Sequence, residues 1–133
     1  MRTIKVSARW TGEKLNFVGT DTKGNQIEIG GDNVTPGQMM LLALAGCTGM
    51  DVVSILQKKR QQISDLEVEV SAEQGDEYPK PYQNIRVTFT VKGESIDSKA
   101  VARSIDLSTN KYCVVGQTLH QETDIVTTYE VEE

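Results

Sequence analysis

The sequence lacks several features that would place it in a secreted, membrane or nucleic-acid-binding class. Its 133 residues carry a net charge of −5, which argues against nucleic acid or an anionic membrane as the main partner. The segment from Met1 to Trp10 alternates polar and apolar residues and has no apolar stretch of the kind found in secretion signals. Repeats and low-complexity tracts are also missing. We therefore expect one cytoplasmic domain that covers residues 1–133.

Long uninterrupted apolar runs are missing as well. The longest apolar stretch, 39–56, has nearly the length of a membrane span, but Thr48, Asp51 and two glycines, Gly46 and Gly49, interrupt it. We therefore interpret this stretch as the core helix of a folded domain.

The residues around this stretch mark both ends of a helix. Thr35 and Gln38 have the spacing of a capping box, and Pro36 stands at the first helical position, where no N–H is needed. Three basic residues, 58–60, place positive charge where the helix dipole is negative. The sequence therefore predicts a helix over 35–60. Because this helix is apolar almost all round, we expect it to be buried.

Shorter strands and helices are predicted on both sides of the long helix. Alternation of polar and apolar residues predicts strands at 3–10, 15–20, 26–29, 66–73, 85–92 and 125–131. Ser95 or Asp97 can begin a helix that ends near Leu107, and the pair Ser108–Thr109 can begin a shorter one over 110–119. This order is typical of the α+β class, with helices packed on one face of an antiparallel sheet. One small sheet cannot cover a helix that is apolar on all sides, so we expect an intertwined homodimer.

The sequence has only two cysteines, and they stand in different surroundings. A pair of cysteines without a secretion signal indicates free or cycling thiols more than a structural disulfide. Cys47 lies in the middle of the long helix. If Thr109 caps the short helix, Cys113 lies in its first turn beside Lys111, where the helix N-terminus and the cation would lower the pKa of a thiol. A two-cysteine redox cycle, in which a sulfenic acid on one cysteine condenses with the other, would use this arrangement.

The two cysteine segments together resemble a known family. LLALAGCTGMDVVSIL around Cys47 and NKYCVVGQTL around Cys113 are similar to the OsmC/Ohr family of hydroperoxide-reducing proteins. The flanking DVVSIL and DLSTNKYC segments are most similar to its YhfA-like branch. The resemblance implies an OsmC-like intertwined homodimer with active sites at the subunit interface. It also implies a cysteine peroxidase that reduces organic hydroperoxides with a thiol or dithiol reductant. Cys47 would then be the peroxidatic cysteine and Cys113 the resolving one.

The chain departs from the family pattern at one position. Characterised members carry a Glu directly after the Pro that opens the long helix, paired with an Arg that steadies the reactive thiolate. This chain has Gly37 in that place, followed by Gln38. The nearest candidate for the cation is Arg9, and the amide of Gln38 could hydrogen-bond an arginine or a peroxide without contributing charge. We therefore predict a catalytic set of Cys47, Cys113, Arg9 and Gln38, with weakened activity.

Each of these groups also has a structural interpretation. Both cysteines could be small core residues. Gln38 could serve only as a capping residue, and Arg9 could be a solvated strand charge. Asp51 follows Cys47 by four residues and shares its helix face, where its charge would oppose a thiolate. We therefore interpret Asp51 as a structural partner for a cation or a cap.

The sequence contains no motif for metal-dependent or hydrolytic chemistry. Cys47, Cys113 and His120 lack the local spacing of a metal site, so we predict neither a metal nor a cofactor. We interpret His120 as a residue that serves the C-terminus of the short helix. Ser54 has no histidine partner for hydrolysis. Three methionines of the long helix could line an apolar pocket for hydroperoxides, with core packing as the default: Met39, Met40 and Met50.

Three functions from different classes remain open at this point. The first is a thiol-dependent peroxidase, and the second is a redox-sensing or small-ligand-binding stress protein without turnover. The third is a structural stress protein whose buried cysteines are inert. The resemblance favours the first.

Overall fold

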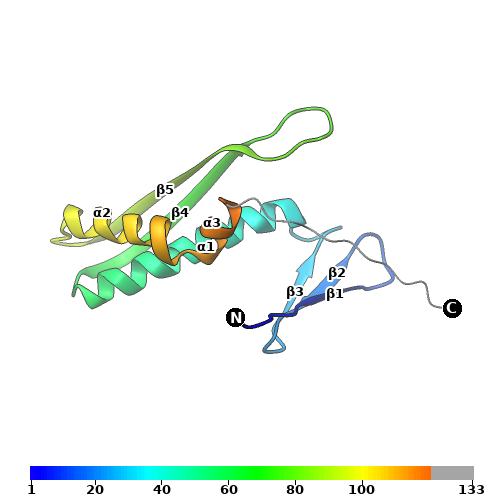
Figure 1. The fold of residues 1–133 in the computed structure, drawn as a ribbon, viewed down its shortest axis with the longest axis horizontal. Coiled ribbons are helices and arrows are strands. Elements are labelled where there is room, and N and C mark those ends of the chain that lie inside the picture. Colours follow the sequence, from blue (N-terminus) through cyan, green and yellow to red (C-terminus); the bar gives the residue numbers. More distant parts are fainter. Residues whose placement is uncertain (121–133) are drawn as a thin grey trace. The chain divides into compact units, whose positions relative to one another are not determined.

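The computed structural model describes residues 1–120, so the strand predicted at 125–131 lies outside the described residues. The elements follow in chain order as β1 (Ser7–Trp10), β2 (Phe17–Thr20), β3 (Gln26–Ile29), α1 (Pro36–Lys58), β4 (Gln62–Glu73), β5 (Gln83–Glu94), α2 (Ser98–Leu107), the π-helical turn η1 (Ser108–Tyr112) and α3 (Val114–Leu119) (Figure 1). The α+β class predicted from the sequence is confirmed.

The described chain forms two compact units. The first, which we call the sheet unit, comprises Met1–Ala43 and Val70–Arg86. The second, which we call the cysteine unit, comprises Leu44–Glu69 and the described residues from Val87 onward. Both cysteines belong to the cysteine unit.

The sheet unit contains an antiparallel three-stranded sheet with β2 in the middle. β3 has the bounds that the sequence predicted, but β1 is shorter than the predicted strand 3–10. The reason is the length of its partner. β2 ends at Thr20, which lies opposite Ser7, so β2 offers no partner to residues 3–6.

α1 begins and ends close to the predicted positions. The backbone N–H of Gln38 donates to Oγ1 of Thr35 at 3.3 Å, which confirms Thr35 as the N-cap. At the other end, Arg60 adopts a left-handed backbone conformation with a φ of 56°. Across that turn the N–H of Gln61 donates to the carbonyl of Leu56 at 2.9 Å. A carbonyl in the last turn of the helix therefore keeps a hydrogen-bond partner where the chain leaves the helix.

The prediction that α1 is buried on all sides is wrong for the single chain. The buried residues of the helix are Thr48, Val52 and Leu56. Leu42 is 59% exposed and Met50 is 75% exposed. We expected the methionines of the helix to pack in the core by default. In the single chain, Met50 does not.

α1 also has the length and composition of a membrane span. That observation is weak, because the core helix of a folded domain meets the same criterion. The helix supplies Val52 and Leu56 to a hydrophobic core that they share with Ala100 of α2. We therefore keep the interpretation of α1 as a core helix.

The core of the cysteine unit forms where α1 and α2 pack against β4 and β5. Partly buried apolar side chains surround its centre: Ile63, Leu66, Phe89, Val91, Val101 and Ile105. α2 starts at the second of the two predicted caps, since the side chain of Asp97 accepts a hydrogen bond from the N–H of Lys99 at 2.9 Å. This packing fixes the end of α2, from which the chain enters the segment that carries Cys113.

Candidate functional site

Cys47 lies in α1, one turn before the residues that enter the core. Its side chain is half-buried, and it is a free thiol. Asp51 follows four residues later, so both side chains project from the same face of the helix. The sequence predicted this shared face, and the structure confirms it by bringing the two side chains together.

Cys113 has a different local structure from the one predicted. We expected Thr109 to cap a helix over 110–119, with Cys113 inside its first turn. The chain instead continues from α2 into η1, and the N–H of Cys113 donates to the carbonyl of Ser108, five residues earlier, at 2.9 Å. Cys113 is itself the N-cap of α3, and its Sγ accepts a hydrogen bond from the N–H of Gly116 at 3.3 Å. His120 closes α3 as its C-cap, as expected.

The central feature of the site is a cluster of three side chains. Sγ of Cys47, a carboxylate oxygen of Asp51 and Sγ of Cys113 all lie within 4.8 Å of one another. Cys47 and Asp51 are half-buried, whereas Cys113 is only 2% exposed. The redox cycle expected from the sequence requires the two thiols to lie near each other, and in the structure they do, with the carboxylate of Asp51 close to both.

A chain of hydroxyl groups holds Asp51 in place. Oγ of Ser108 donates to Oδ2 of Asp51 at 2.9 Å. Oγ of Ser108 also lies 2.9 Å from Oγ1 of Thr48. Because a serine hydroxyl has one proton, and Ser108 gives it to the carboxylate, Thr48 is the donor in the second bond. Thr48 and Ser108 are both buried, so the hydroxyl groups of this network are shielded from water.

Asp51 and Ser108 are the residues that sequence reasoning misjudged. We expected a cation or a helix cap as the partner of Asp51, but its recorded partner among the described residues is a neutral hydroxyl. The four-residue spacing from Cys47 was the available signal for Asp51. Ser108 was expected only as part of a helix cap, and its contact with Asp51 could not be predicted, because its position depends on the π-helical turn η1.

Burial raises the pKa of Cys113 above the ordinary thiol value of 9.0. The hydrogen bond from the N–H of Gly116 lowers the pKa, but the hydrogen bond and charge of Cys47 and the charge of Asp51 raise it further. The expected lowering of the pKa by a helix N-terminus is present, through the N–H of Gly116 at the start of α3, but burial outweighs it. The expectation that the pKa of Cys113 as a whole would be lowered is therefore wrong. The Lys111 side chain lies over the Tyr112 ring at 5.3 Å.

Arg9 and Gln38, the other two predicted catalytic residues, lie in the sheet unit. Arg9 is an exposed residue of β1, opposite Val18 of β2. Gln38 lies in the first turn of α1, where its backbone N–H makes the capping bond. Their roles at the cysteines stay predictions.

Gly37, the position at which the resemblance implies a Glu, faces a tyrosine. A Cβ atom at this position would lie 2.7 Å from the hydroxyl oxygen of Tyr82. The space that a side chain at position 37 would enter is therefore taken by Tyr82. The lack of a carboxylate at position 37 and the placement of Tyr82 are therefore linked.

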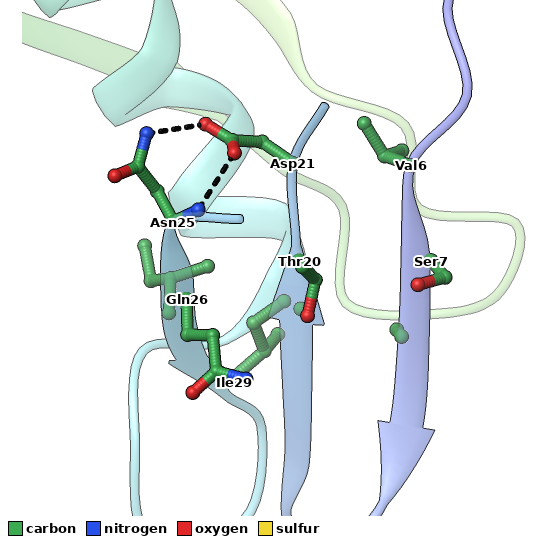
Figure 2. Close-up of a pocket in the computed structure, with 10 residues that line it drawn as sticks. Val6, Ser7, Thr20, Asp21, Asn25, Gln26 and Ile29 are labelled. Carbon is green, nitrogen blue, oxygen red and sulfur yellow. Dashed lines mark hydrogen bonds between the residues drawn. The ribbon is translucent and has the colours of Figure 1, made fainter. Parts of the chain in front are cut away.

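The sheet unit also has a hollow of about 530 Å³ along its sheet (Figure 2). Its lining residues come from all three strands and the β2–β3 turn: Val6, Ser7, Ala8, Gly19, Thr20, Asp21, Asn25, Gln26, Ile27 and Ile29. At one end, the backbone N–H and the side-chain amide of Asn25 each donate to Asp21 at 2.8 Å. These two bonds hold the pKa of Asp21 below its ordinary value, and the bond from the Asn25 side chain has the larger effect. None of these lining residues is a cysteine.

These observations define a small α+β protein that holds a pair of free thiols and a carboxylate in one cluster. Comparison with known families extends the assignment. The family described as OsmC-like protein matches residues 29–128. The chain therefore belongs to the OsmC-like family.

Relatives of known sequence and structure agree with this assignment. Protein YhfA of Escherichia coli K12 is 39% identical over 96% of this chain and 98% of its own length. A solved structure of a hypothetical protein from Aquifex aeolicus VF5 matches with a TM-score of 0.81 and 28% identity, over 90% of this chain and 88% of that chain. The organic hydroperoxide resistance protein OhrB of Bacillus subtilis matches with a TM-score of 0.55 and 18% identity, over 90% of this chain and 91% of that chain, and so shares the fold.

Proposed function

We propose that this protein is a thiol-dependent peroxidase that reduces organic hydroperoxides through Cys47 and Cys113. The observation that supports this proposal most directly is the separation of the two Sγ atoms, which is no more than 4.8 Å. Formation of the disulfide would bring the two sulfurs from this separation to the bonding distance of about 2.05 Å. The name of the Bacillus subtilis structure supports the choice of organic hydroperoxides as the substrate class.

The cycle balances in three steps. The Cys47 thiolate attacks the distal oxygen of the hydroperoxide, the O–O bond breaks, and the alkoxide takes a proton and leaves as an alcohol. The thiol of Cys113 then condenses with the Cys47 sulfenic acid to form the disulfide and release water. An external reductant of the dithiol class then reopens the disulfide by thiol–disulfide exchange and is itself oxidised.

The difference in burial supports the proposed roles of the two cysteines. Cys47 is half-buried, so a hydroperoxide can approach its sulfur from solvent, whereas Cys113 is almost completely covered. The raised pKa of Cys113 keeps this residue as a thiol at neutral pH. A thiol suffices for the resolving step, because it attacks a sulfenic acid that lies next to it.

The remaining parts of the proposal come from the family. Arg9 would supply the cation that steadies the Cys47 thiolate, and Gln38 would hydrogen-bond that arginine or the peroxide. An intertwined homodimer would cover the apolar side chains of α1 that one chain leaves exposed, such as Met50 at 75%. A reducing cytoplasm would keep both thiols free between cycles.

Single-turnover and steady-state assays with cumene hydroperoxide test the proposal. The reduced protein should lose two thiols per chain and release one alcohol, and it should turn over when a dithiol is supplied. Cys47→Ser should lose all activity. Cys113→Ser should stop at a sulfenic acid that dimedone traps. Because Ser54 is an exposed α1 residue outside the cluster, Ser54→Ala serves as the matched control and should react like the wild type.

Two results would count against the enzyme. Retention of both thiols after exposure to the hydroperoxide would show that the cysteines are inert. Loss of the thiols with no turnover under any dithiol would show a protein that senses peroxide without reducing it catalytically.

A further inference from the structure

We propose that the reduced cluster of Cys47, Asp51 and Cys113 is a binding site for a thiophilic divalent cation, of which Zn²⁺ fits the donors best. We call these three residues the S₂O cluster. The inference goes beyond the proposed peroxidase and does not depend on it, because it needs neither a peroxide nor a cycle. The ligands differ from Cys47, Cys113 and His120, the set that we considered from the sequence and rejected as a metal site.

The geometry of the S₂O cluster matches the reach of one metal ion. Three atoms that lie within 4.8 Å of one another fit inside a circle with a radius of about 2.8 Å. Zinc binds thiolate sulfur at about 2.3 Å and carboxylate oxygen at about 2.0–2.2 Å. A contraction of roughly half an ångström towards the centre therefore satisfies all three bonds. Side-chain rotation can supply such a shift without movement of the backbone.

The donor set selects the class of cation. Two thiolate sulfurs favour zinc and other soft or borderline ions, whereas Mg²⁺ and Ca²⁺ require oxygen ligands. Three protein ligands leave the fourth tetrahedral position to water, as in zinc sites that remain open. Binding replaces the protons of the two thiols, so each cation displaces two protons when both cysteines start as thiols.

Neighbouring groups hold the ligands as a metal site requires. Ser108 donates to Oδ2 of Asp51 at 2.9 Å, and Thr48 in turn orients Ser108. The carboxylate is therefore fixed before a cation arrives, and Oδ1 is not used in this bond. The N–H of Gly116 donates to Sγ of Cys113 at 3.3 Å, which stabilises a thiolate at that sulfur. Such outer contacts are typical of metal sites and tune their affinity.

The same sulfurs cannot serve the metal and a disulfide at once. Oxidation joins Cys47 to Cys113 and leaves Asp51 as the sole ligand, so the oxidised chain should not hold the cation. Conversely, a bound cation withdraws charge from the sulfur of Cys47 and so makes it a weaker nucleophile towards an oxidant. Metal binding and oxidation of the S₂O cluster are therefore predicted to exclude each other.

The test uses the full chain, reduced and freed of metal with a chelator that is then removed. Titration with Zn²⁺ against a chromophoric competitor should show one ion per chain and a release of two protons. Cys47→Ser and Cys113→Ser should each weaken binding by about 100-fold or more, since loss of only an outer-shell partner costs about 10–100-fold. Asp51→Asn should weaken it by at least about tenfold. Asp65→Asn, an exposed β4 carboxylate, is the matched control and should bind like the wild type.

A second measurement does not depend on the variants. The wild type titrated with Co²⁺ should develop the near-ultraviolet absorption of thiolate-to-cobalt charge transfer, and the disulfide form should not. The proposal is overturned if the reduced chain takes up no Zn²⁺, if the charge-transfer band is missing, or if Asp51→Asn binds as tightly as Asp65→Asn. Peroxide reduction is assayed separately with chelator present. A chain that reduces peroxide but binds no zinc refutes only this inference, and the reverse result refutes only the proposed function.

Discussion

At the scale of single residues, the two thiols of the cluster differ in what surrounds them. Cys47 projects from the side of a long helix and is half-buried, whereas Cys113 caps a short helix and is almost fully covered. Asp51 lies within 4.8 Å of both sulfurs and is tied to Ser108. Cys47 is thus partly accessible to solvent, whereas Cys113 beside it is almost inaccessible.

The first prediction concerns the pH dependence of Cys113. Because burial raises its pKa, alkylation of Cys113 by iodoacetamide should reach half of its maximal rate above pH 9.0, the ordinary thiol value. The folded chain also holds this proton more tightly than the unfolded chain. The resulting contribution to the free energy of unfolding is present below pH 9.0 and is lost as pH rises through the folded pKa. Site-resolved mass spectrometry measures the alkylation, and a half-point below 9.0 would contradict the assigned environment.

The residue scale also shows where sequence reasoning stops. The shared face of Cys47 and Asp51 follows from helix geometry alone, so it could be predicted. The cap at Cys113 could not be predicted, because the π-helical turn η1 takes up residues 108–112 and α3 starts only at Val114 instead of at 110. Such turns are rare and carry no residue signature, although they recur at functional sites.

At the scale of elements, α2 offers a direct test of the described helix start. Asp97→Ala removes the side-chain acceptor for the N–H of Lys99, so the free energy of unfolding should fall by about 1 kcal/mol. Urea denaturation measures the change, and Ser95→Ala is the control, since Ser95 is the alternative cap that the structure does not use. An equal or larger loss in the Ser95 variant would contradict the assignment of the cap.

The start of α1 carries the departure from the family pattern. If the missing carboxylate limits the reaction, Gln38→Glu should raise the rate of peroxide reduction, because a carboxylate would pair with the activating arginine. Gly37→Glu should raise the rate less, since its Cβ must displace the hydroxyl of Tyr82. The double change Gly37→Glu with Tyr82→Phe removes that obstacle and should act faster than Gly37→Glu alone. If all three variants react at the wild-type rate, the missing carboxylate is not what limits activity.

The elements differ in how well local sequence determined them. α1 and β3 were predicted closely, because a cap, a terminal charge cluster and turn residues mark their ends. β1 was overestimated, since the end of a strand depends on the length of its partner and not on its own alternation. Burial of α1 was also overestimated, because apolar composition shows that a surface needs cover without showing what covers it.

At the scale of the whole molecule, α1 leaves apolar side chains exposed in the single chain, such as Leu42 at 59% and Met50 at 75%. We predict a homodimer, whose sedimentation should correspond to twice the chain mass of 14.7 kDa. Met50→Asp should weaken the dimer strongly, because it places a charge in a surface that the partner would cover. Asp106→Lys, on an exposed position of α2, is the charge-change control. A wild type that sediments as a monomer at micromolar concentration, or a Met50→Asp variant that remains fully dimeric, would contradict the prediction.

The most direct measurement is the mass of the Cys47–Cys113 peptide pair after the reduced protein meets one equivalent of cumene hydroperoxide. The proposed cycle predicts that the two peptides become cross-linked, with the loss of two hydrogens, and that a dithiol separates them again. Recovery of both peptides as unmodified thiols, while the hydroperoxide remains intact, would contradict the account.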